Sequence, residues 1–174
     1  MPANWLQSRC WPNMQNLTVR FIRTRGFVSW LICFISFSYE DHCEAKNRAK
    51  NAWVGAHAGT GIEPRSLDWA DKDIIWCREY DIPCTDEQYE RAMKFQEAAI
   101  GTKYNYWACL GVLLRNRKLN NPMRKDCSEH LFEILYETFQ KPPLNILNQF
   151  SWMVTPELCH LAPVLIGRCV SKVG

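Results

Sequence analysis

The chain of 174 residues is long enough for one domain and little more. Hydrophobic residues make up 47% of it and charged residues 22%, which is ordinary for a globular protein and excludes disorder, collagen and coiled coil. The net charge of +3 is small and the basic residues are scattered, so no nucleic-acid partner is expected. We expect residues 1–13 to form an irregular tail and residues 14–174 to form a single domain.

The nine cysteines are the unusual feature of the composition. Their number is odd, so at least one thiol stays unpaired, and no pair has the Cys-x-x-Cys spacing of common zinc fingers and thioredoxins. Residues 1–13 lack the apolar run of a signal peptide. The longest apolar stretch, residues 27–37, is about half the length that spans a bilayer. These features predict a reduced, cytoplasmic protein without stable membrane insertion.

The first half of the chain predicts a strand, a helix and further strands. Residues 17–23 alternate between apolar and polar side chains, as in a half-buried strand. Residues 27–37 predict a short, mostly buried helix, whose inner side would carry Val28, Leu31, Ile32 and Ile35. Residues 42–46 are polar and predict only a short, edge or distorted strand, whereas residues 53–58 and 73–80 are better strands.

The second half of the chain is mostly helical in its pattern. Thr85 and Gln88 form a capping box at the start of a helix that Gly101 ends. A second helix is predicted over residues 127–139 after a loop at 120–125, followed by a short helix at 155–161 and a last strand at 163–170. The order of a strand, a helix, several strands, further helices and a last strand predicts an α+β domain.

Cys127 is the thiol whose surroundings differ from those of the others. It opens a helix just after Arg124 and Lys125, and helix amides and nearby cations favour the thiolate. A nucleophilic thiol also needs an imidazole within reach, and the available ones are His42, His57, His130 and His160. The alternative is that Cys127 is a small buried core residue.

Cofactor and metal motifs are missing from the sequence. The glycines are dispersed, so neither a dinucleotide-binding nor a phosphate-binding loop is predicted. Cys127 and His130 would make half of a metal site, but no second half-site has matching spacing. We therefore expect no cofactor and no metal, and structural roles for His130 and His160.

Two segments in this half resemble a known family. Gly101-Thr-Lys-Tyr-Asn105, followed by Asp126-Cys-Ser-Glu129 at a helix start, resembles the permuted papain-like hydrolases. These are relatives of the NlpC-type peptidases and of the lecithin:retinol acyltransferase group, and the YiiX-like branch is most similar. Asp41-His-Cys-Glu44 resembles the family's histidine strand, although its polar residues depart from the usual apolar pattern. The resemblance covers about residues 17–161.

The resemblance implies a fold and a set of site residues. The fold is a small antiparallel sheet packed on helices, circularly permuted so that the histidine strand precedes the cysteine helix. Cys127 corresponds to the nucleophile, His42 to the general base and His57 to the residue that orients the imidazole. Tyr104 and Ser128 would lie at the substrate and oxyanion position.

The same resemblance implies a thiol-dependent hydrolase, a peptidase or amidase. It would cleave an amide or ester through an acyl-enzyme, with a peptidoglycan peptide, another amide or an acyl lipid as substrate. A phage or bacterial protein that acts at the cell envelope would fit. The alternative is a catalytically degenerate member that binds a peptide or a lipid, because the polar histidine strand has decayed.

Overall fold

The computed structural model describes residues 14–36, 38–114, 116–140, 155–156, 159–160 and 168–173. The expected tail, residues 1–13, lies outside this part of the chain. So do residues 157, 158 and 161 of the short helix expected at 155–161, and residues 163–167 of the strand expected at 163–170.

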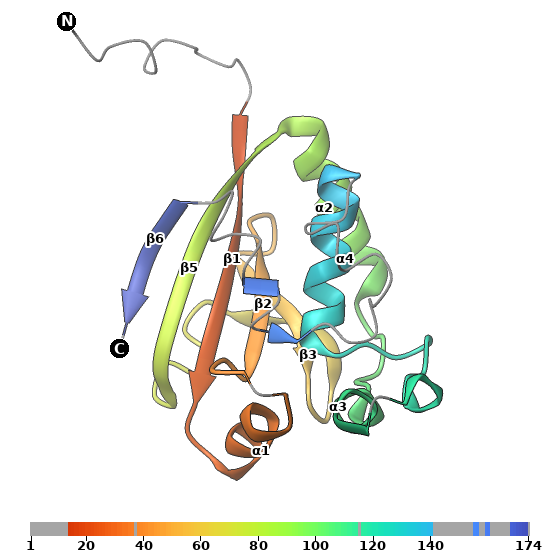
Figure 1. Ribbon diagram of the computed structural model, residues 1–174. Helices are drawn as coiled ribbons and strands as arrows, with labels where there is room; N and C mark the ends of the chain where they lie inside the picture. The colour runs from red at the N-terminus through yellow and green to blue at the C-terminus, as the bar shows by residue number, and fades with distance from the viewer. Residues whose placement is uncertain are drawn as a thin grey trace, which may run out of the picture.

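A six-stranded antiparallel sheet forms the centre of the molecule (Figure 1). Its strand order is β4-β3-β2-β1-β5-β6. The strands are β1 (Met14–Thr24), β2 (His42–Asn47), β3 (Ala52–His57), β4 (Gly61–Ser66), β5 (Ile74–Thr85) and β6 (Arg168–Val173). The long β1–β5 pair is the central ladder, in which Leu17 lies opposite Ile82.

Two helices, α2 (Asp86–Ala99) and α4 (Cys127–Phe139), pack on one face of this sheet (Figure 1). The strand predicted at residues 17–23 is found within β1, and its apolar residues Leu17, Val19 and Phe21 are fully buried. It is not half-buried, because Thr18, Arg20 and Ile22 on the other face are buried as well. Leu17, Val19 and Phe21 pack with Leu131 and Ile134 of α4 in the main core. The α+β class is therefore confirmed.

Both predicted helix starts are found. The Thr85 hydroxyl accepts from the Gln88 amide and the Gln88 side chain accepts from the Thr85 amide, which is the capping box. Asp126 caps α4, and its carboxylate accepts from the Glu129 amide at 2.8 Å. Cys127 is consequently the first residue of α4.

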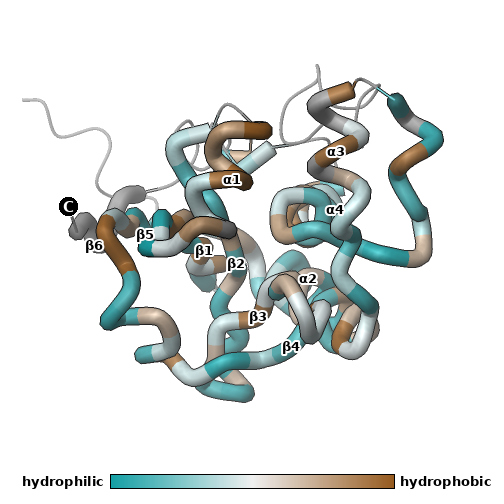
Figure 2. Tube along the Cα trace, turned by 90° about the horizontal axis from the view of Figure 1, so that it is seen from below, coloured by the Kyte–Doolittle hydropathy of each residue, from teal (hydrophilic) through white to brown (hydrophobic). Residues whose placement is uncertain are grey.

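The prediction of a mostly buried helix over residues 27–37 is wrong. Helix α1 (Phe27–Ser36) forms, but Phe27, Phe34 and Leu31 are 73%, 61% and 37% exposed. Trp30 stacks between the rings of Phe27 and Phe34 on the outer side of the helix. The helix lies at one end of the sheet, beside α3 (Tyr106–Leu114), so only one narrow side meets the protein (Figures 1 and 2).

Strand β2 is short, with six residues, but it is not an edge strand, because it lies inside the sheet between β1 and β3. Its polar residues Glu44 and Asn47 are buried. β5 runs to Thr85, with Pro83 paired to Asn16, and β6 covers 168–173. β4 and α3 were not predicted. Among the described helices, none is long and apolar enough to cross a membrane.

Candidate active site

Cys127 lies where the start of α4 meets the start of β2. Its side chain is buried, with 4% exposure, and its Sγ atom lies 3.9 Å from the Asp41 carbonyl oxygen. Asp41 is itself fixed, because its amide donates to the Ile22 carbonyl and its carboxylate accepts from the Thr24 hydroxyl at 2.7 Å. The backbone just before His42 is thus held against the helix that carries the thiol.

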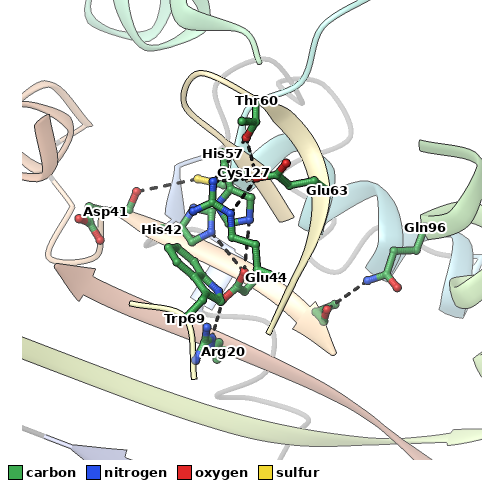
Figure 3. A network of polar contacts seen from close by, with 12 residues as sticks. Arg20, Asp41, His42, Glu44, His57, Thr60, Glu63, Trp69, Gln96 and Cys127 are labelled. Carbon is green, nitrogen blue, oxygen red and sulfur yellow. Dashed lines mark hydrogen bonds and ion pairs between the residues drawn. The ribbon is translucent and has the colours of Figure 1, made fainter. Parts of the chain in front are cut away.

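His42 is the residue that connects the thiol to the far face of the sheet. It begins β2, its side chain is 12% exposed, and its imidazole makes a polar contact with Cys127 (Figure 3). Its Nε2 atom lies 3.5 Å from Oε2 of Glu44, which leaves Nδ1 to face the thiol. The next residue but one in a strand points to the same face, so Glu44 is positioned behind His42 by the strand itself.

Glu44 is a fully buried carboxylate that is held by hydrogen bonds from neighbouring side chains. Its Oε1 atom accepts from Arg20 Nε at 2.5 Å and from Trp69 Nε1 at 3.0 Å. Gly55 on β3 makes room for it, because a Cβ atom at that position would come within 2.8 Å of the Glu44 Cβ. These contacts fix one oxygen and leave the other, Oε2, directed toward the histidines (Figure 3).

His57 ends β3 next to His42. The two rings are 4.7 Å apart between centroids, and His57 Nε2 lies 3.8 Å from Glu44 Oε2. Trp69 packs edge-on against both imidazoles, at 5.6 Å from His42 and 4.7 Å from His57. Both histidines therefore converge on the same carboxylate oxygen.

The pKa values of the pair shift in opposite directions. A hydrogen bond from Cys43, and then contact with His42 and its charge, hold the pKa of Cys127 well below its ordinary value despite burial. Burial alone would lower the pKa of His42, but polar contacts with Cys127 and Glu44 and their negative charges raise it to about 10. Both shifts favour transfer of the Cys127 proton to His42.

The neighbouring groups titrate differently. Burial, followed by the positive charge of His42, lowers the pKa of His57 to about 2, so this ring is neutral. Contacts with His42 and then with Arg20 lower the pKa of Glu44 although burial opposes them. Burial and the nearby Cys127 charge raise the pKa of Asp126, the cap of α4, to about 7.

A cleft of about 410 Å³ opens onto the histidines. Its lining includes His42, His57, Trp69 and Tyr104, and the first turn of α1 closes one side with Phe27. Tyr104, predicted to lie near the cleft, is one of its lining residues. Cys127 is not among the lining residues, and the lining residue that contacts it is His42.

The remaining predicted residues are not among those that line the cleft. The Ser128 hydroxyl donates to the Asp126 carboxylate at 2.7 Å, and its carbonyl accepts from Cys159 at 3.1 Å. His160 has a structural role, since its ring bonds to Glu40 and to the Tyr80 hydroxyl, each at 2.6 Å. His130 is buried in the core. The oxyanion roles of Tyr104 and Ser128 and the orienting role of His57 remain predictions.

Glu44 is the residue that sequence reasoning missed. The signal was present, because Glu44 follows His42 by two residues in a strand and must share its face. Its burial depends on Arg20 and Trp69, which come from distant parts of the chain and have no spacing relation to it.

Comparison with known proteins supports the fold. No family model matches the chain, and no curated protein matches its sequence. The crystal structure of the metalloprotein YiiX from Escherichia coli O157:H7 is similar, with a TM-score of 0.62 and 14% identity over 91% of this chain and 97% of that one. This chain shares the YiiX fold.

Proposed function

We propose that the chain is a thiol-dependent hydrolase of the permuted papain-like type. The observation that carries the proposal is the arrangement of Cys127 at the first residue of α4, in contact with His42, with Glu44 behind the imidazole. Nucleophile, base and positioning carboxylate are the three parts that this chemistry needs. The shared YiiX fold is consistent with the YiiX-like branch that the sequence resembles.

The reaction begins with attack of the Cys127 sulfur on an amide or ester carbonyl. A C–S bond forms, and the negative oxygen faces the amides at the start of α4, with Tyr104 beside the cleft. His42 gives its proton to the leaving amine or alkoxide as the C–N or C–O bond breaks. Water then attacks the thioester while His42 takes its proton, which releases the acid and restores the thiol.

Glu44 and His57 position the imidazole in this scheme. Glu44 faces the Nε2 side of His42 and stabilises the imidazolium, and its own orientation comes from Arg20 and Trp69. His57 packs against the ring of His42 as a neutral neighbour. Peptidoglycan stem peptides, other amides and acyl lipids are the proposed substrates.

A second candidate is a degenerate protein that binds a peptide or a lipid in the cleft. One observation favours it: Cys127 is 4% exposed and lies outside the cleft lining. The same cleft and the same histidines would then form a binding site without turnover.

Trapping of the acyl-enzyme separates the two candidates. Chelator-treated protein is incubated with stem peptides and with p-nitrophenyl acyl esters, quenched in acid and analysed by intact mass. The hydrolase predicts an acyl adduct on Cys127 that Cys127→Ala abolishes and that His42→Gln forms at least 100-fold more slowly. Binding without any adduct for either substrate class would favour the degenerate protein.

A further inference from the structure

Three buried polar atoms converge on the sheet face opposite α4 and lack hydrogen-bond partners in the described part of the chain. They are His42 Nε2, Glu44 Oε2 and His57 Nε2. Orphaned buried polar atoms are costly, and three of them facing one point call for a partner that all three can share. Neither histidine has a good hydrogen bond to Glu44, because the separations of 3.5 and 3.8 Å are too long.

We propose that His42, Glu44 and His57 bind a divalent transition-metal ion, of which Zn²⁺ suits the donors best. The three donor atoms lie within 4.8 Å of one another. Zn²⁺ binds histidine nitrogen and carboxylate oxygen at about 2.0–2.2 Å, which sets neighbouring ligands of a tetrahedral site roughly 3.4 Å apart. Two of the three separations are already within a few tenths of an ångström of this value.

The surroundings of the three donors suit a metal. Arg20 and Trp69 hold the other oxygen of Glu44, as outer contacts of a ligating carboxylate do. Both histidines line the cleft of about 410 Å³, which supplies a route for the ion and leaves a fourth position for water. Motif spacing missed this site because Glu44 and His57 are thirteen positions apart and meet only through the pairing of β2 with β3.

The proposed metal site does not depend on the proposed hydrolase activity. The effect of a bound metal on catalysis does rest on that proposed function. A neutral imidazole that binds a metal through Nε2 must carry its proton on Nδ1. It then has no lone pair to accept the proton of Cys127, so the bound metal removes the general base. Metal occupancy and hydrolysis therefore exclude each other, and a chelator is expected to activate the enzyme.

The test is direct binding of Zn²⁺ to chelator-stripped protein, measured by competition with a chromophoric chelator. Wild type is expected to bind one equivalent, and His57→Gln to bind at least tenfold more weakly. His130→Gln is the matched control and is expected to retain the wild-type affinity within about twofold, because His130 is not a ligand. Circular dichroism checks that each variant is folded.

Co²⁺ supplies a second readout that needs no variant. Nitrogen and oxygen ligands give visible ligand-field bands without the thiolate-to-metal charge-transfer band in the near ultraviolet. Failure of wild type to bind one equivalent, unchanged binding by His57→Gln, or a charge-transfer band that Cys127→Ser removes would overturn the proposal. Alkylation of Cys127 in the stripped protein tests the hydrolase separately, so the two failures are distinguishable.

Discussion

Glu44 organises the site at the scale of single residues. One oxygen is bonded to Arg20 and Trp69, and the other faces two imidazoles, so residues from β1, β2, β3 and the turn before β5 meet at one carboxylate. A buried charge of this kind is tolerated only when it is paired. The ion pair with Arg20 thus supports both the fold and the position of His42.

Removal of Arg20 is expected to be strongly destabilising. In Arg20→Ala the buried Glu44 carboxylate loses its guanidinium, and breaking a buried pair costs about 3–5 kcal/mol of unfolding free energy. Lys50→Ala is the matched control, because the Lys50–Glu97 pair is 37% and 45% exposed and such pairs contribute roughly 0–1 kcal/mol. Urea denaturation measures both, and losses of similar size would contradict this account of Arg20.

At the scale of helices and strands, the elements set by neighbouring residues in the sequence are predicted well. Those that depend on contacts between distant segments are not. The helix over residues 127–139 was predicted with its observed bounds, since its cap and its apolar spacing lie in the local sequence. β4 was missed because Glu63, Pro64 and Arg65 make a polar edge strand without alternation. The exposure of α1 was missed because an apolar sequence predicts a helix and its length but does not tell how much of the helix surface other segments cover.

The residues of the candidate site also fall into those that the sequence identifies and those that only the structure shows. Cys127 was identified by its helix start, and His42 by resemblance, and the structure brings them together. Tyr104 was placed at the cleft. Glu44, Arg20 and Trp69 form their cluster only through strand pairing and a turn, which no local pattern encodes.

Two glycines with similar backbone angles test how closely β4 packs on the segment before α3. Gly61 and Gly101 have φ of +93° and +90°, but a Cβ at Gly61 would meet the Thr102 carbonyl oxygen at 2.2 Å, whereas nothing lies within 4 Å at Gly101. Gly101→Ala is expected to lose about 1–2 kcal/mol from backbone strain. Gly61→Ala should lose a further 1–3 kcal/mol or so from the clash. Equal losses in thermal or urea denaturation would show that the two segments are not in close contact.

At the scale of the whole molecule, the sheet separates an apolar core from a polar site. Cys43 and Ala45 of β2 face α4 in the core, while His42 and Glu44 on the same strand face away from it. The thiol meets its base where β2 begins and the helix starts. This division lets a hydrophobic core hold the helix rigidly while ionised groups remain paired on the other face.

The pH dependence of stability reports on the core through His130. Burial lowers its pKa to about 3, so in acid the unfolded chain binds a proton that the folded chain does not. Its contribution is complete above about pH 6.5 and is lost as the pH falls, by about 1.4 kcal/mol per pH unit. His130→Gln should remove that part of the slope between about pH 6 and 4.5 in urea denaturation. An unchanged slope would mean that this imidazole is not buried in its neutral form.

The rate of Cys127 alkylation as a function of pH tests the central claim most directly. Chelator-treated protein is labelled with iodoacetamide from about pH 6 to 9, and peptide mass spectrometry measures the rate at each cysteine. We expect Cys127 to react at a nearly constant rate, because its thiol pKa is held low, while burial, which raises the pKa of Cys33 and Cys77 to about 11, keeps these two unreactive. In His42→Gln the Cys127 rate should rise about tenfold per pH unit, as for an ordinary thiol. A wild-type rate that rises in the same way, or that is no faster than at Cys33, would contradict a thiolate paired with His42.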